Sequence, residues 1–353
     1  MKGISLFSSA GIDELMLNKV GIKIVVANEL LSKRVEVYKF WHPKVEVING
    51  DITNDDIKRR IICKAIDNKI DFILNTPPCQ GVSLIGKNKS NSDMAADERN
   101  YLIFHSFDIM DEILPKYIMI ENVPRFLNLI YDYNGERLNI TQILEKKYGE
   151  IYNIDVGVYN AADYGVPQNR QRAIIKMYKK GLTWLEPKKQ KIITVREAIG
   201  HLPSIESGEV SSIKNHAGRK HTEKQVLWMK NTPTGKSAFE NEIYYPKKSN
   251  GEKLKGYSAT YKRINWDKPA PTITMRNDAI SSQSNVHPGR KLSDGTYSDA
   301  RVLSLRELFI LSSINPDINV PDTVSEIQLR HMVGEGVPPK LIYEIIKGIK
   351  QND

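Results

Sequence analysis

Apolar and polar segments alternate along the first half of the chain in a way that predicts strands separated by helices. Short apolar runs typical of buried strands occur at residues 3–7, 22–27, 45–48, 70–74 and 116–120. Segments with helical spacing lie at residues 12–20, 32–40, 55–68 and 101–114. This alternation predicts an α/β fold with a doubly wound, Rossmann-like parallel sheet and right-handed crossovers.

The pattern changes after two further predicted strands, at residues 155–159 and 173–177. Residues 178–300 contain lysine pairs and many Gly, Ser, Asn and Thr residues, which indicates a smaller, loop-rich module. Helices are again expected at residues 304–312 and 341–349. We therefore expect a first domain over 1–177, a second over 178–300, and a return segment over 301–353. The return segment should complete the small domain and pack its last helix on the first domain.

Composition and charge narrow the class of protein. The 353 residues are 40% hydrophobic and 26% charged, which is typical of a soluble globular protein, and no apolar run could span a membrane. The N-terminus lacks the pattern of a signal peptide, so a cytoplasmic location is expected. The formal net charge of +9 favours a polyanionic partner, most often nucleic acid. Two cysteines are too few for a zinc site or a disulfide framework, and we expect no metal.

One of these cysteines is a candidate nucleophile. Cys79 follows Pro77 and Pro78, which end the predicted strand at 70–74, and ligands bind at that edge of open α/β sheets. A lone cysteine is more often an inert packing residue, which is the interpretation we give to Cys63 in the helix at 55–68. The assignment of Cys79 as a nucleophile therefore depends on whether suitable partner residues occur further along the chain.

Those partners follow later strands. Glu121 comes after the strand at 116–120 and can act as a general acid toward a ring nitrogen. Arg170 and Arg172 lie at alternate positions leading into the strand at 173–177, so we expect them to point the same way, where they can hold a phosphate and a base carbonyl together. An ordinary surface pair is the alternative for the two arginines.

The ends of the first three strands suggest a cofactor. A turn of small residues at 8–11 lets a ligand approach the backbone, Glu29 can accept two ribose hydroxyls, and Asp51 can accept from an adenine amino group beside Ile52. Each feature alone is explained by a tight turn or a solvated acid. Together they favour a cofactor that contains a nucleoside. Dinucleotides and ATP are disfavoured because their phosphate-binding motifs are absent.

Two polar stretches are candidates for contact with a substrate. Residues 86–100 resemble a loop that can close over a substrate at Cys79, although a solvated surface loop explains them equally well. Residues 272–276 are the candidate recognition surface of the loop-rich module, with a plain strand as the alternative.

Taken together, these motifs closely resemble the DNA (cytosine-5)-methyltransferase family of bacterial restriction-modification systems. The resemblance rests on Leu6-Phe7, Glu29, Gly50-Asp51, Pro77-Pro78-Cys79-Gln80, Glu121-Asn122-Val123, Gln168-x-Arg170-x-Arg172, Arg306-Glu307 and the segment from Gly334 to Pro339. It covers nearly the whole chain apart from about residues 185–285. Ser5 stands where the family usually has aspartate, Ser9 and Ile12 replace glycines, and Glu335 replaces an asparagine.

The resemblance implies an enzyme that transfers a methyl group from S-adenosylmethionine to C5 of a cytosine in a specific duplex DNA sequence. The base would be flipped out of the duplex and Cys79 would attack its C6, with Glu121 at N3, Arg172 at O2 and Arg170 assisting. The implied cofactor residues are Phe7, Ser8, Ser9, Ala10, Gly11, Glu29, Leu30, Asp51, Ile52, Pro77, Leu102, Glu335 and Val337. The expected DNA-binding residues are Gln80, Ser83, Lys87, Lys89, Arg99, Gln168, Thr272, Thr274 and Arg276.

Two other functions are weighed against this one. A tRNA cytosine-5 methyltransferase can share the fold, but such enzymes usually carry a Cys-Phe-Thr signature, and none occurs here. A non-catalytic DNA-binding regulator is disfavoured because Cys79, Glu121 and Arg172 are all present. We expect a monomer that binds duplex DNA and does not bind membranes. A cognate restriction endonuclease that acts separately is compatible with the family.

Overall fold

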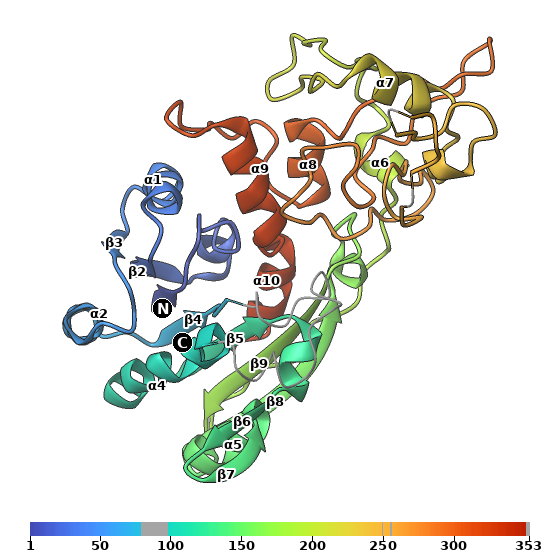
Figure 1. Cartoon of the computed structure of the whole chain (residues 1–353). Coiled ribbons are helices and arrows are strands. Elements are labelled where there is room, and N and C mark those ends of the chain that lie inside the picture. The colour runs from blue at the N-terminus through green and yellow to red at the C-terminus, as the bar shows by residue number, and fades with distance from the viewer. Residues whose placement is uncertain (79–97, 249, 255, 351–353) are drawn as a thin grey trace. The chain divides into compact units, whose positions relative to one another are not determined.

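The computed structural model describes residues 1–78, 98–248, 250–254 and 256–350 (Figure 1). The chain forms two compact units. Unit 1 contains Met1–Asn160, Gln171–Lys188 and the chain from Ile342 onward, and unit 2 contains Ala161–Arg170 and Lys189–Leu341. The predicted division into a catalytic and cofactor domain over 1–177, a recognition domain over 178–300 and a return segment over 301–353 stays a prediction.

A mixed seven-stranded sheet forms the centre of unit 1. Its order is β3-β2-β1-β4-β5-β9-β8. The strands are β1 (Lys2–Leu6), β2 (Lys23–Glu29), β3 (Glu46–Asn49), β4 (Phe72–Asn75), β5 (Tyr117–Asn122), β8 (Tyr152–Asn160) and β9 (Gln171–Lys179). Strands β1 to β5 pair in parallel, which confirms the predicted Rossmann-like α/β fold. Strand β9 is antiparallel to both β5 and β8, because the connection between β8 and β9 contains no crossover helix.

Three of the four helices predicted for this part of the chain form, as α1 (Ser32–Trp41), α2 (Asp55–Asn68) and α4 (Leu102–Ile113). The helix α5 (Ile140–Tyr148) and the small hairpin of β6 (Ile130–Tyr133) and β7 (Glu136–Asn139) before it were not predicted. The predicted helix at residues 12–20 is wrong, since only the 3-10 turn η1 (Leu17–Val20) forms there. In the residues before η1, backbone N–H groups donate to carbonyl oxygens three residues earlier rather than four, from Glu14 to Gly11 and from Leu17 to Glu14.

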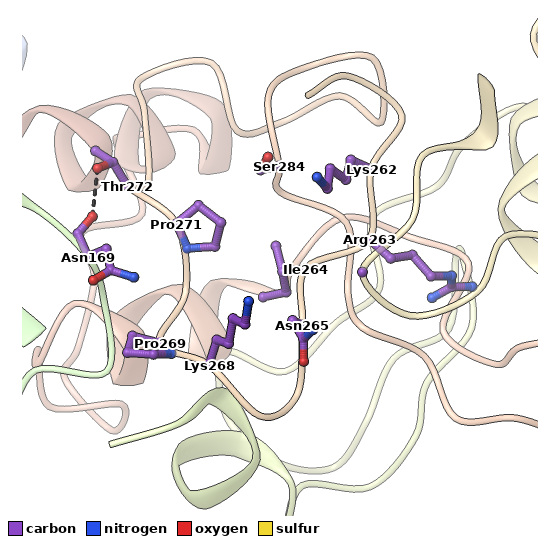
Figure 2. Close-up of a pocket in the computed structure, with 11 residues that line it drawn as sticks. Asn169, Lys262, Arg263, Ile264, Asn265, Lys268, Pro269, Pro271, Thr272 and Ser284 are labelled. Carbon is purple, nitrogen blue, oxygen red and sulfur yellow. Dashed lines mark hydrogen bonds between the residues drawn. The ribbon is translucent and has the colours of Figure 1, made fainter. Parts of the chain in front are cut away.

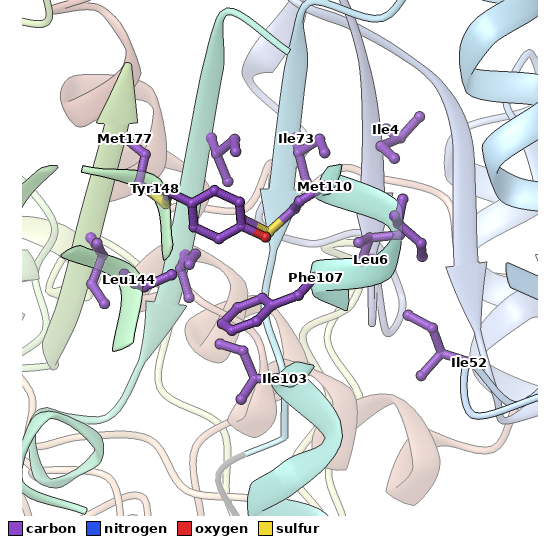
Figure 3. Packing of buried hydrophobic residues seen from close by; sticks show 14 of the residues in the cluster. Ile4, Leu6, Ile52, Ile73, Ile103, Phe107, Met110, Leu144, Tyr148 and Met177 are labelled. Carbon is purple, nitrogen blue, oxygen red and sulfur yellow. The ribbon is translucent and has the colours of Figure 1, made fainter. Parts of the chain in front are cut away.

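The core of unit 1 lies between the sheet and its helices. Figure 3 shows Phe107 and Met110 of α4 beside Tyr148 of α5, with Ile73 of β4 and Met177 of β9 nearby. These side chains are buried, and the Tyr148 hydroxyl donates to Asp111 at 2.7 Å. The packed core fixes the sheet whose carboxyl edge carries the candidate site.

Unit 2 is rich in loops. Its helical elements are η5 (Ala161–Tyr164), α6 (Val195–Ile199), α7 (Glu223–Lys230), η6 (Ala238–Glu240), α8 (Leu305–Leu311) and α9 (Glu326–Glu335), and α10 (Pro339–Ile346) begins there and continues into unit 1. Among the described residues of unit 2 only isolated β-bridges occur. The plain strand considered for residues 272–276 is therefore wrong.

Buried arginines donate hydrogen bonds to backbone carbonyl oxygens and carboxylates within these loops. Arg263 donates to the carbonyl oxygens of Met229 and His287, at 2.9 and 2.8 Å. Arg301 donates to Asp299 and, through both terminal nitrogens, to Glu307. Buried carbonyl oxygens need partners, so guanidinium groups at these positions allow irregular backbone to form a compact unit.

Candidate active site

The carboxyl edge of the sheet brings the segment before Cys79 next to the end of β5. The Asn122 side chain donates to the carbonyl oxygen of Pro77 at 3.0 Å, and Thr76 donates from its backbone nitrogen to Leu6 at 3.2 Å. The backbone two residues ahead of Cys79 is thereby fastened to both β5 and β1. Five predicted site residues, Cys79, Gln80, Ser83, Lys87 and Lys89, lie outside the described part of the chain.

Two of the predicted catalytic residues form an ion pair at this edge. Arg172 of β9 and Glu121 of β5 lie on neighbouring antiparallel strands, and the Arg172 Nε is 2.7 Å from the Glu121 Oε1. Their side chains are only 11% and 9% exposed. A charge-assisted pair so shielded from water holds both groups in a defined orientation. The structure thus brings together an acid and a cation next to the segment that leads to Cys79.

Arg170 does not share a strand face with Arg172, which corrects our expectation. It precedes β9 and belongs to unit 2, where its guanidinium donates to the carbonyl oxygens of Ile273, Gly334 and Glu335 at 2.8–2.9 Å. The catalytic role given to Arg170 stays a prediction. In the described structure this side chain braces the loops of unit 2.

Gln168 has a similar bracing position. Its side chain is 1% exposed, donates to the Leu311 carbonyl at 3.2 Å and accepts from the Ile273 backbone nitrogen at 3.2 Å. The buried amide is therefore an internal link between loops. The DNA contact predicted for Gln168 stays a prediction.

The turn after β1 alternates in backbone conformation. Phe7, Ser9 and Gly11 have φ values of 57°, 47° and 70°, alternating with residues of ordinary conformation. Its N–H groups brace the turn, because Ser8 donates to the Asn28 carbonyl, Ser9 to the Glu29 carboxylate and Gly11 to the Ser8 carbonyl. At Gly11 a Cβ would lie 2.7 Å from the His42 ring, so the tight turn requires glycine there.

The acids at the ends of β2 and β3 flank this turn. Glu29 is buried, and its carboxylate accepts from the Ser9 backbone nitrogen at 2.9 Å and from that of Leu31 at 2.8 Å. Asp51 is exposed and Ile52 is buried beside it. A carboxylate oxygen with one N–H partner can still accept a hydroxyl. Glu29 and Asp51 can therefore accept the hydroxyl and amino groups that a nucleoside cofactor offers.

The other predicted cofactor residues are distributed over both units. Pro77 is buried at the end of β4, Leu102 begins α4, and Leu30 is exposed. Glu335, at the end of α9, and Val337 belong to unit 2. Their roles toward a cofactor stay predictions.

Two buried acids in unit 1 were missed by the sequence analysis. Asp13 and Glu14 lie in the turn between β1 and β2, and the Tyr38 hydroxyl donates to Glu14. Burial raises the pKa of Asp13 well above its usual range, and the neighbouring Glu14 and Glu121 carboxylates raise it further. Burial also raises the pKa of Glu14. Adjacent acids within an otherwise apolar pattern were the available signal.

Asp13→Asn is expected to stabilise the protein at neutral pH. The folded state keeps the Asp13 proton to a higher pH than the unfolded state, so stability is lost as pH rises from the ordinary aspartate pKa toward the raised one. Asparagine removes that loss. The melting temperature of the variant should exceed that of the wild type by more at pH 7 than at pH 4. The exposed Asp132→Asn should show no such widening, and a pH-independent difference for Asp13→Asn would contradict this account.

Unit 2 contains a basic cleft of about 470 Å³ (Figure 2). Lys262 and Lys268 contribute ammonium groups to it, and the Thr272 hydroxyl donates to the Asn169 carbonyl at 2.6 Å on its border. Of the other predicted DNA contacts, Arg276 and Arg99 are exposed, and Thr274 is partly buried. The cleft therefore combines cations with hydrogen-bonding groups beside the predicted recognition segment.

The chain shares its fold with solved structures of methyltransferases. It matches a prophage-encoded DNA modification methyltransferase of E. coli with a TM-score of 0.72 at 20% identity, over 99% of this chain and 98% of that one. It also matches a mutant DNMT2 of Spodoptera frugiperda with a TM-score of 0.62 at 19% identity, over 98% of each chain. At these identities the likeness shows the fold.

Comparison of the sequence with known proteins identifies the family. The chain belongs to the C-5 cytosine-specific DNA methylase family, whose family model matches residues 1–351. It is 53% identical over 347 residues to the type II methyltransferase M1.HgaI of Avibacterium volantium, covering 98% of this chain and 97% of that protein. It is 29% identical to the type II methyltransferase M1.HphI of Haemophilus parahaemolyticus, covering 98% and 86%. The predicted activity, a DNA cytosine-5 methyltransferase of the restriction-modification type, is confirmed.

Within the described ranges, no helix has both the length and the apolar character needed to cross a membrane. The same residues contain no cluster of three His, Cys, Asp or Glu side chains suited to a metal ion.

Proposed function

We propose that the chain methylates C5 of a cytosine that is flipped out of a specific duplex DNA sequence, through a covalent bond between the Cys79 sulfur and C6 of the base. The observation that carries this proposal is the buried ion pair between Glu121 of β5 and Arg172 of β9. The residue after Glu121, Asn122, donates a hydrogen bond to the carbonyl oxygen of Pro77, two residues before Cys79. An acid, a cation and the backbone leading to a thiol thus meet at one sheet edge. A base flips out at a cost of roughly a few kcal/mol.

The proposed steps use the pair in fixed roles. The Cys79 thiolate adds to C6, and the electron pair of the C5–C6 bond moves toward C5. Glu121 donates a hydrogen bond or proton at N3 while Arg172 holds O2, so that the charge developing on the ring is stabilised. After C5 takes the methyl group, the donor would leave as a neutral thioether. Water would then accept the C5 proton, the C5–C6 double bond would re-form as the thiolate leaves C6, and the N3 proton would return to Glu121. Cys79 is thereby regenerated.

S-adenosylmethionine supplies the methyl group as an electrophile on its sulfonium. Glu29 supports binding of the ribose hydroxyls, and the tight turn of Phe7, Ser9 and Gly11 beside it is the segment that we assign to the methionine part of the cofactor. Asp51 and Ile52 would hold the adenine. These assignments rest on the same strand order, β3-β2-β1, that brings the three groups to one edge.

DNA recognition is assigned to unit 2 and to the polar stretch after Cys79. Lysines would contact phosphates, and Thr272, Thr274 and Arg276 would face base edges. We propose that the protein acts on DNA in the cytoplasm as a monomer. A separate endonuclease of the same specificity would be its functional counterpart.

A label-transfer assay tests the function. The protein is incubated with S-adenosylmethionine labelled in its methyl group and with duplex DNA, tRNA or neither. Transfer to duplex DNA alone, followed by bisulfite sequencing that locates one motif, is expected. Transfer to tRNA would instead favour the RNA enzyme, and transfer to neither would favour a non-catalytic regulator.

Glu29→Ala is expected to weaken cofactor binding by roughly 1.5–3 kcal/mol, because a charged acceptor for two hydroxyls is lost. This corresponds to an increase in Kd of about 10- to 150-fold, measured by calorimetry with S-adenosylmethionine. Glu36→Ala, on α1 with a side chain that is 40% exposed and pairs with Lys33, is the matched control and should bind normally. Unchanged affinity in a folded Glu29→Ala protein would contradict a role in cofactor binding, and Glu29 would then serve only to hold the turn at Ser9.

A further inference from the structure

A short hairpin of unit 2, formed by residues 245–248 and 250–254, carries a dense group of lysines. Lys247 and Lys253 face each other in an antiparallel bridge, and backbone bonds from Lys248 to Glu252 and from Leu254 to Pro246, at 2.8 and 2.9 Å, close the hairpin. Gly251 takes a φ of +86° at the tip, which permits the reversal of the chain.

Two of the lysines share one aromatic ring. The Nζ atoms of Lys247 and Lys253 each lie 4.6 Å from the centroid of the Tyr245 ring. Neither has a carboxylate partner in the part of the chain that the structure describes, whereas Lys248 pairs with Glu252 at 2.8 Å. The two Nζ atoms are therefore at most 9.2 Å apart, twice 4.6 Å, and like charges at such a separation repel each other. A phosphate anion at this end of the hairpin would be attracted by both ammonium groups.

Exposed side chains flank the hairpin along the chain. Tyr257 is 83% exposed and Ile243 is 69% exposed. The backbone near Tyr257 packs on unit 2, because a Cβ at Gly256 would lie only 2.2 Å from the Phe239 ring. Lysines clustered on an exposed surface are the electrostatic footprint expected where a protein contacts nucleic-acid phosphates.

We infer that Lys247 and Lys253 form a phosphate clamp for the backbone of duplex DNA. The inference rests on the proposed function and adds that the residues which bind DNA phosphates differ from those which read the bases. An ammonium group is a point charge without the planar fork that reads base edges. The clamp therefore positions the duplex and sets affinity, while the recognition sequence is read elsewhere. An acidic protein partner is the competing occupant.

The test uses the full-length chain and the double variant Lys247→Ala/Lys253→Ala, with Lys236→Ala as the matched control. Lys236 is an exposed lysine of unit 2 that is already paired with Glu240. Fluorescence anisotropy with a mixed-sequence duplex, over a range of salt concentrations, gives log Kd against log salt. The double variant should lower the slope by about 1 for each lysine, and the control should leave it unchanged.

Methylation distinguishes a phosphate clamp from a base-reading element. Bisulfite sequencing of DNA treated with the double variant should show the wild-type motif, with activity that is lower at high salt. An unchanged salt slope would overturn the inference, as would a changed motif. If the wild type itself neither binds nor methylates duplex DNA, the proposed function fails instead, so the two failures are distinguishable.

Discussion

Cys79→Ser is expected to abolish the covalent complex that the wild type forms with duplex DNA carrying 5-fluorocytosine at the target position. After the thiolate adds to C6 and the methyl group arrives, release requires loss of the C5 substituent as a cation, which fluorine cannot do. The adduct therefore stalls and should survive denaturing electrophoresis. A serine hydroxyl is a far poorer nucleophile near neutral pH than a partly ionised thiol. Turnover should fall by roughly four orders of magnitude or more.

The second cysteine provides the control. Cys63 was interpreted from the helical pattern as a packing residue, and that prediction is wrong, since its side chain is exposed on α2. An exposed thiol is a stricter control than a buried one, because it is available for any non-specific addition. Trapping should persist in Cys63→Ser and should require S-adenosylmethionine. Peptide mapping of a cross-link to a residue other than Cys79 would overturn the assignment of the nucleophile.

The sequence predicted those parts of the fold that local periodicity determines. The helix predicted at 55–68 forms as α2, with Asn54 accepting from the backbone nitrogens of Asp56 and Ile57 at its start. The parallel strands followed from their apolar runs. The helix predicted at 12–20 did not form, because burial of Asp13 and Glu14 and the tight turn ending at Gly11 depend on contacts with distant residues such as Tyr38 and His42.

The same distinction applies to the candidate site. Residues that end strands, such as Glu29 and Glu121, could be placed at one sheet edge because parallel strands share their carboxyl end. The pairing of Glu121 with Arg172 needed the antiparallel register of β9, which the pattern did not reveal. Arg170 differs because its partners are backbone carbonyls more than a hundred residues away. No local pattern of side chains encodes such contacts.

Glu121→Gln is expected to lower turnover by roughly two to four orders of magnitude while leaving DNA affinity similar. Glutamine keeps the shape of the side chain and can still accept from Arg172 through its amide oxygen, so the position of Arg172 should be preserved. It cannot carry a proton to N3, and the charge developing on the base is then poorly stabilised. Single-turnover methylation separates this chemical step from binding.

A structural role for Glu121 would give a different result. Loss of the ion pair in a buried site would lower the melting temperature and disturb Arg172, and DNA binding would weaken along with turnover. A chemical role predicts instead that trapping by 5-fluorocytosine slows in proportion to turnover, since thiolate addition to C6 needs the same stabilisation at N3. Glu136→Gln, at an exposed acid paired with Lys146, should change neither rate. Normal turnover in a folded Glu121→Gln protein would remove Glu121 from the mechanism and leave Arg172 as the group that activates the ring.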